Sequence, residues 1–459
     1  MNKLDNFDKL LKKKAREEVC YIPENLNRSI NNTLANLPNN KKHKRSIKKI
    51  ALVAALVAAI SCTTVLASTT STIKNTLSGI ISHFDNTKDT RYITDKTSFD
   101  KFNKSIGVSV QDKGIKFKVE NIATDDNFMN IFYTIESQNS INMFPNDDDA
   151  KIFEAFLSTP FLKLKINGKE AKESNHNDID AYFQSDKVLK VMRRFNVSQI
   201  NLPEKFDVEI STDEIFKTKG KWVITASVDK SDVAVETKTV KPNIKKTIDL
   251  GDYKHSIIID KVSISPFGDQ IVISEKTLND RLFDIFAIFD DKGNNLDVLN
   301  TDIQGSRFGK ATNSFEFIKG STGMKYISLV PIKFTESGKA IIEKVDIQKL
   351  PITFKTNNAG SRIVDKIEFD KNVIRIKYHN EGLQLWDPAF LFYDAAGNDL
   401  DLGANGSTTA VDRQTGEFTQ TLTFGNKNVD FSKIAKIGTF TGVQKIDLLK
   451  DQAIKINLQ

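Results

Sequence analysis

An uncharged run near the N-terminus constrains this chain more than any other feature. Residues 50–67 read IALVAALVAAISCTTVLA and contain no charged side chain. A helix of this length covers about 27 Å, close to the hydrocarbon thickness of about 30 Å in a bilayer. Both flanks are strongly polar, which argues against a buried helix of a soluble domain. We therefore expect one transmembrane helix over residues 50–67.

The charges beside this run predict its orientation. Six cations stand directly before it: Lys41, Lys42, Lys44, Arg45, Lys48 and Lys49. Under the positive-inside rule such a cluster stays on the cytoplasmic side, with the side-chain stems reaching to the interface. The sequence therefore predicts a single-pass protein of the cell membrane, with a cytoplasmic N-terminus and an extracytoplasmic C-terminal part.

Two other interpretations of the run are weaker. Val65, Leu66 and Ala67 resemble the small-residue end of a cleaved signal peptide, but the charged region before the run is far longer than that of ordinary signal peptides. Cys62 makes a poor lipoprotein site because Ala59 stands where leucine is expected. An uncleaved anchor is favoured.

The first 49 residues read as two short amphipathic helices. Apolar residues recur at helical spacing from Leu4 to Leu11, and again from Leu26 to Leu37, with Pro23 suited to a first helical turn. Such helices cannot bury their apolar faces alone. They could rest on anionic membrane lipid or grip a cytoplasmic protein. For the second alternative, the expected partner-binding residues are Leu10, Leu11, Leu26, Ile30 and Leu34.

The net charge of +7 belongs to this tail and not to the rest of the chain. Residues 1–49 hold 13 of the 66 Lys and Arg residues and only 5 of the 59 Asp and Glu residues, which leaves the remainder nearly neutral. A nucleic-acid-binding face needs clustered cations on the folded part. We therefore expect no nucleic-acid partner.

The outer part is predicted to be mainly β. From Ile106 onward, apolar and polar residues alternate, as in Val108 and Val110 or Ile131, Tyr133 and Ile135. We expect a connector over residues 68–105, a β domain over 106–240, and two antiparallel β-sandwiches of the immunoglobulin-like type over 241–358 and 359–459.

An internal repeat supports the tandem sandwiches. The segment from Phe289 to Asp297 matches the segment from Tyr393 to Asp401 at an offset of 104, and Asp260 to Val262 matches Asp365 to Ile367 at 105. The shared Asp-x-x-Gly-Asn-x-Leu-Asp pattern favours a hairpin turn over a calcium loop, because it lacks the ligand order and the distal glutamate of such loops.

No motif indicates catalysis. The five histidines are scattered, and no nucleophile elbow, phosphate loop or dinucleotide fingerprint is present. Cys20 and Cys62 fall on the expected cytoplasmic side and in the membrane, so they cannot form a structural disulfide. We expect a protein that is not an enzyme and needs no cofactor.

Several short motifs resemble a known family: Gram-positive single-span proteins with the extracellular domain of unknown function 4179, followed by an immunoglobulin-like domain. They are the Tyr21–Glu24 segment with Leu26 and Ile30, the basic cluster and apolar run, the segment Asp112–Phe117, which opens the outer domain, and the segment Ile264–Gly268. The resemblance assigns residues 106–240 to the 4179-type domain.

The resemblance implies an anti-sigma-factor-like regulator of envelope-responsive transcription, with an extracytoplasmic-function sigma factor bound to the tail. Cys20 stands alone, without the His-x-x-x-Cys-x-x-Cys motif of zinc-type anti-sigma factors, so this contact would be helical and apolar. The competing hypothesis is a passive surface protein whose outer domains bind wall polymer or another protein.

Overall fold

The computed structural model describes the chain from residue 83 onward, with gaps: residues 83, 92–93, 96–141, 154–171, 179–251, 253–277, 283–305, 309–318, 320, 323–337, 341–370, 372–385, 387–404, 406–412, 415–424, 429–441 and 444–459. The predicted tail, basic cluster and apolar run lie outside these residues. Within the described part, no helix is long and apolar enough to cross a membrane. All modules below lie in one compact unit, Thr69–Gln459.

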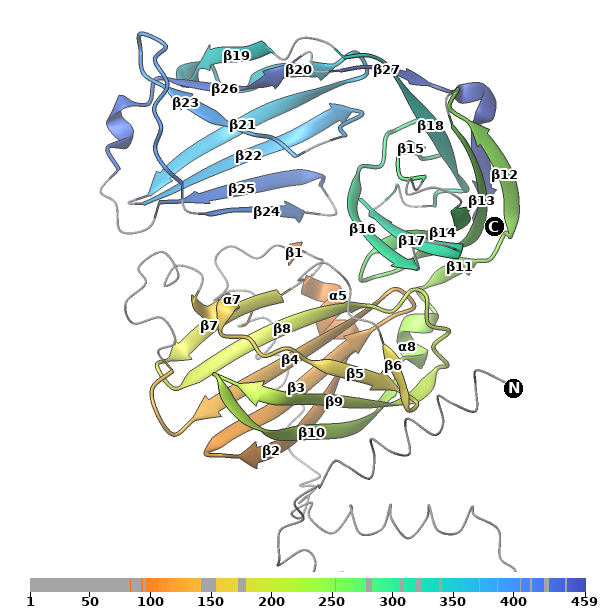
Figure 1. The fold of residues 1–459 in the computed structure, drawn as a ribbon, viewed down its shortest axis with the longest axis vertical. Coiled ribbons are helices and arrows are strands. Elements are labelled where there is room, and N and C mark those ends of the chain that lie inside the picture. Colours follow the sequence, from red (N-terminus) through yellow and green to blue (C-terminus); the bar gives the residue numbers. More distant parts are fainter. Residues whose placement is uncertain are drawn as a thin grey trace, which may run out of the picture. The chain divides into compact units, whose positions relative to one another are not determined.

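The first module is built from two antiparallel sheets (Figure 1). One sheet has the order β2-β3-β4-β8-β7 and the other β10-β9-β5-β6. Their bounds are β2 Asn103–Asp112, β3 Ile115–Thr124, β4 Phe128–Ser137, β5 Lys163–Ile166, β6 Lys169–Ala171, β7 Ile179–Ser185, β8 Val188–Asn196, β9 Lys205–Ile215 and β10 Thr218–Asp229. Three short helices accompany them: α5 Lys96–Phe102, α7 Glu154–Leu157 and α8 Ser231–Ala234.

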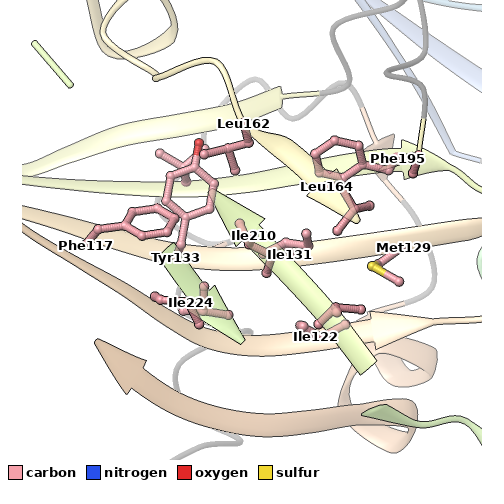
Figure 2. Close-up of a cluster of buried hydrophobic side chains, with 14 of the residues drawn as sticks. Phe117, Ile122, Met129, Ile131, Tyr133, Leu162, Leu164, Phe195, Ile210 and Ile224 are labelled. Atoms are coloured by element: carbon pink, nitrogen blue, oxygen red, sulfur yellow. The ribbon is translucent and has the colours of Figure 1, made fainter. Parts of the chain in front are cut away.

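The core of this module explains its strands. Phe117 and Tyr133 come from neighbouring strands of one sheet, whereas Ile210 and Ile224 come from the other, and Figure 2 shows them in one cluster. Burial along β3 alternates over its first six residues, as a strand with one buried face requires. Burial also alternates along β2, so the predicted alternation is confirmed for β2 and β3, whereas β4 is buried on both faces from Phe128 to Ile135.

The second module also has two sheets. One runs β11-β13-β14-β17-β16, with β12 also on β13; in the other, β18 pairs with β15, β27 and β28. The bounds are β11 Lys238–Val240, β12 Ile244–Asp249, β13 Lys254–Ile264, β14 Asp269–Thr277, β15 Phe286–Phe289, β16 Val298–Gly305, β17 Gly309–Phe317, β18 Tyr326–Ser337, β27 Gln444–Leu448, η5 Lys450–Gln452 and β28 Ile454–Asn457.

The third module lies between β18 and β27 in the chain. Its larger sheet has the order β24-β25-β22-β21-β20, extended by β1, which is parallel to β24; the smaller sheet is β19-β26-β23. The bounds are β1 Tyr92–Ile93, β19 Ile341–Asp346, η3 Ile347–Lys349, β20 Ile352–Asn357, β21 Gly360–Asp370, β22 Val373–Gly382, β23 Leu391–Tyr393, β24 Gly406–Asp412, β25 Glu417–Thr423, η4 Phe431–Lys433 and β26 Lys436–Thr441.

The predicted repeat is confirmed in backbone detail. In each copy the glycine N–H donates to the aspartate carbonyl, as in Gly293 to Asp290 and Gly397 to Asp394. The aspartate carboxylate accepts from the N–H of Asn294 or Asn398 at 2.8 Å in both copies. These carboxylates serve the turn, which agrees with the hairpin interpretation of the motif.

The second pair of matching segments, Asp260–Val262 and Asp365–Ile367, also has the same structure in both copies. Asp260 and Asp365 each stand at a register shift, in β13 and β21. Each carboxylate is hydrogen-bonded to the equivalent position of the next strand, where Ser274 occupies the first copy and His379 the second. The two modules therefore share one strand plan.

The boundary between the copies differs from the expected position at residues 358 and 359. Strands β19 and β20 precede Asn358 but belong to the third module, and β20 pairs with β21 directly across this point. Conversely, β28 at the C-terminus pairs with β18 and adds Ile454 and Ile456 to the core of the second module. The third module is thus inserted into the second. The predicted boundary was wrong because a repeated motif reveals the offset between copies but not where a copy starts.

Candidate functional site

The first two modules meet through buried polar contacts around the turn between β3 and β4. The carboxylate of Asp125 accepts from the main-chain N–H groups of Asn127 and Phe128, both at 2.7 Å. From the second module it accepts from the hydroxyl of Ser265 at 2.7 Å and the N–H of Phe267 at 2.9 Å. Burial raises the pKa of Asp125, while these donors act in the opposite direction.

An ion pair closes the same junction. Arg194 on β8 makes a bidentate contact with Glu316 on β17, at 2.9 and 2.6 Å, and also donates to the carbonyl of Phe267. Both side chains are almost fully buried, and the guanidinium lies 3.2 Å from the centre of the Phe128 ring. A buried pair with these extra contacts fixes geometry, because either charge alone would be strongly destabilising.

The loop Ser265–Gly268 of the second module contacts both Asp125 and Arg194 of the first. Phe267 is fully buried against Phe99 and Phe102 of α5, and the carbonyl of Gly268 accepts from the side-chain amide of Asn127 at 2.7 Å. This loop belongs to a segment that carries the family resemblance. Its role in the structure is to dock the second module on the first.

A separate cleft of about 1010 Å³ lies where the second and third modules meet. The second module contributes residues of β15, β16 and the repeated turn, and the third contributes residues of β21, β22, β24 and β25. An apolar cluster beside it, containing Ala287, Ile332, Leu383 and Ile446, packs the two modules together. The side chain of Asn358 exchanges two hydrogen bonds, each 2.9 Å long, with the backbone of Ile446.

A chain of polar groups crosses the cleft wall. The Nε of Arg362 donates to Asn380, whose amide donates to the Asp297 carboxylate at 2.9 Å. The other oxygen of Asp297 accepts from Asn295 at 2.6 Å. Burial lowers the pKa of Arg362 and raises that of Asp297, since both charges are partly removed from water.

The two copies of the repeated aspartate have different roles. Asp297 in the second module reaches the third module through Asn380. Its counterpart, Asp401, is exposed and accepts only the local N–H of Gly403 among the described hydrogen bonds. The repeat thus contributes a turn to both modules but a cleft residue to the second one only.

The site residues predicted from sequence and the residues of this cleft come from different parts of the chain. The expected partner-binding and topology residues all lie outside the described part of the chain. Of the cleft residues, Asp297 belongs to the repeated motif, whereas Arg362 and Gln420 belong to no predicted motif. The sequence offered one signal, which is the scarcity of arginine: the chain has 11 arginines among its 66 basic residues. Two of them, Arg194 and Arg362, are buried where modules meet. Among described residues, no group of three potential ligands could hold a metal ion.

The comparisons with known proteins identify two segments. Residues 42–137 match a family model described as a domain of unknown function (DUF4179), and residues 237–354 match one described as a family of unknown function (DUF5643). The first match runs from the basic cluster to the end of β4, and the second covers strands β11 to β19 and part of β20. A search of curated proteins found no match.

Two solved structures show distant similarity. A conserved domain protein from Bacillus anthracis is 14% identical, with 53% of this chain and 82% of that chain covered and a TM-score of 0.37. The N-terminal eight Ig domains of the Down syndrome cell adhesion molecule are 10% identical, with 77% and 41% covered and a TM-score of 0.14. Neither match is close enough to assign the fold.

Proposed function

We propose that this protein is a single-pass membrane regulator: β modules outside the cell sense the state of the envelope, and the N-terminal tail holds a cytoplasmic partner. The observation that carries the proposal is the extent of the DUF4179 match. It runs without interruption from the basic cluster through the apolar run into β4. The apolar run, which we propose as a membrane anchor, and strands β2 to β4 therefore fall within one family model, and this supports the proposal.

The proposed partner is an extracytoplasmic-function sigma factor, with the tail acting as an anti-sigma element. The apolar residues Leu10, Leu11, Leu26, Ile30 and Leu34 would contact it, and Lys41, Lys42, Lys44, Arg45, Lys48 and Lys49 would keep the tail inside. The second and third modules are proposed to be immunoglobulin-like sandwiches, an assignment supported by their two-sheet plan and their size.

The buried junction supports a sensing role for the outer part. Because Arg194, Glu316 and the Phe267 loop lock the first module to the second, a force or ligand acting on the second module would reach the membrane-proximal module as a rigid-body movement. A flexible linker between the modules would absorb such a movement.

The decisive experiment uses the full chain in its native membrane. We expect a sigma factor to co-purify with the wild-type protein, as identified by mass spectrometry, and to be lost from a variant carrying Leu26→Asp and Ile30→Asp. Asn27→Asp with Asn31→Asp is the matched control, because these changes add the same charge without removing apolar residues. Retention of the sigma factor by the Leu26 and Ile30 variant, or its absence from wild type, would contradict the proposal.

The second candidate is a passive surface protein that binds wall polymer or another protein. The cleft between the second and third modules favours this function, since it is lined by many polar side chains that a ligand could contact. The co-purification experiment separates the two candidates: a specific ligand outside with no cytoplasmic partner would support the passive protein.

A further inference from the structure

The cleft between the second and third modules has the composition of a binding site for polar ligands. Five side-chain amides and several hydroxyls line it, beside an apolar wall formed by residues such as Phe334, Val411 and Phe418. Ligand pockets usually range from about 300 to 1,000 Å³ and combine an apolar wall with a few fixed polar groups. This volume suits a ligand of several linked units.

The charges of the cleft exclude two classes of ligand. The carboxylates of Asp284, Asp297 and Asp387 line it, whereas Arg362 is the only cation among the described residues that line it. A fourth carboxylate in the lining, that of Glu316, forms an ion pair with Arg194. A phosphate-rich or otherwise anionic polymer would meet net repulsion here, and a lipid tail would leave the buried polar groups unsatisfied.

Two glutamines give the cleft unused hydrogen-bonding capacity. Gln420 is 7% exposed; its amide nitrogen donates to Ser407, but its oxygen has no partner in the described structure. In Gln384 the other atom of the amide is unpaired: its oxygen accepts from the hydroxyl of Thr356, while its nitrogen has no partner in the described structure. Both unpaired atoms are shielded from solvent, and an unpaired buried polar atom costs about 1–3 kcal/mol. A rotation of either amide toward the cleft lets a ligand with donors and acceptors pair with it and recover part of this cost.

We propose that this cleft binds a carbohydrate chain free of anionic groups. Sugar hydroxyls donate to carboxylate and amide oxygens and accept from amide N–H groups, so one chemical group can pair with Gln420, Gln384 and Asp387 in turn. The apolar wall contacts the C–H faces of the rings. The inference rests on the proposed function in one respect, because it requires the cleft to face outside the cell.

The test is isothermal titration calorimetry of the full chain, purified in a detergent without a sugar headgroup. The probes are the β-1,4-linked tetramers of glucose, N-acetylglucosamine and glucosamine, with tetragalacturonate as the anionic counterpart and tetralysine as a cationic peptide. Asp387→Asn and Gln420→Met alter the cleft, the first at an exposed position and the second with little change in shape. Asp370→Asn and Gln348→Met are the matched controls, because both residues are exposed and do not line the cleft.

We expect saturable binding of at least one of the three uncharged or amine-bearing tetramers. Each cleft variant should weaken it by at least about tenfold, and the control variants should leave it unchanged. The inference is overturned if none of these tetramers binds at up to about 10 mM, if the cleft variants bind as wild type does, or if tetragalacturonate or tetralysine binds more tightly. Unchanged thermal unfolding of the variants shows that they are folded. The sigma-factor experiment does not depend on these residues, so the two proposals can fail separately.

Discussion

Gly382 shows how a single backbone position holds the third module together beside the cleft. Its φ of +72° lies in the left-handed region, and a Cβ there would overlap with the carbonyl oxygen of Ala359. That carbonyl accepts the N–H of Leu383 at 3.0 Å, so it cannot move freely. Glycine is required at this position by both its conformation and its surroundings.

Replacing Gly382 by alanine should therefore destabilise the third module by more than the left-handed conformation alone explains. Gly293→Ala is the control, because its φ is +85° and no atom lies within 4 Å of the added Cβ. We expect a loss of about 1–2 kcal/mol for Gly293→Ala and a clearly larger one for Gly382→Ala, measured by chemical denaturation. Equal losses would mean that the contact with Ala359 is unimportant.

Lys261 predicts a pH dependence at the junction of the first and second modules. Its ammonium group donates to the carbonyls of Asp126 and Ser198, and burial lowers its pKa from 10.5 to about 8. Between these two values the unfolded chain binds more protons than the folded one, so the contribution of Lys261 to stability rises with pH.

Thermal unfolding at pH 7.5 to 10 tests this expectation. The stability of wild type relative to Lys261→Met should increase by up to about 1.4 kcal/mol per pH unit above pH 8. Taking the difference between the two proteins cancels the titration of other groups. A difference that stays constant, or falls, over this range would show that Lys261 is not desolvated in the folded protein.

At the scale of elements, the C-terminal strand completes a module that begins more than 200 residues earlier in the chain. β28 pairs antiparallel with β18, from Tyr326 opposite Asn457 to Leu329 opposite Ile454. In the third module the corresponding partner of β26 is β19, which precedes β20 to β26 in the chain. The same sheet position is thus filled by the last strand of the second module and by the first strand of the inserted segment that builds the third.

Ile456→Asp should therefore unfold the second module and spare the core of the first. Ile456 is fully buried, and an unpaired carboxylate there is expected to cost several kcal/mol. Hydrogen exchange should show lost protection in β15 and β18 with protection retained in β3 and β4. Asn457→Asp places the same side chain on the exposed face of the strand and should leave all four strands protected. Uniform loss across the first module as well would indicate that the modules unfold as one unit.

At the scale of the whole molecule, the Arg194–Glu316 pair makes the junction a mechanical connection. Arg194→Met leaves Glu316 buried without its partner, which is expected to cost about 3–5 kcal/mol, whereas removing both charges costs less. Calorimetry of Arg194→Met should separate the transitions of the first and second modules, and adding Glu316→Met should restore much of the loss.

Arg375→Met serves as the control for the buried pair. Arg375 forms a partly exposed ion pair with Asp370 at 3.9 Å, and pairs of this kind contribute about 0–1 kcal/mol. If Arg194→Met unfolds like Arg375→Met, the junction does not depend on the buried pair, and the rigid-body part of the proposed signalling route fails.

Local patterns predicted the elements of the β modules well. Alternating burial along β3 and the paired hydrogen bonds of the two Asp-Gly-Asn turns depend on residues only a few positions apart, so the sequence carries them directly. The apolar run at residues 50–67 is a similarly local signal, although it lies outside the described part of the chain.

The sequence by itself determined the β character, the turn geometry and the repeat of about a hundred residues. Only the tertiary structure decided that the third module is inserted into the second, that Phe267 and Arg194 dock the first module, and that Asp297 and Arg362 meet at one cleft. Each of these features joins residues tens to more than a hundred positions apart. No local pattern encodes which distant surfaces exclude water together, because that choice depends on how the completed sheets fit one another.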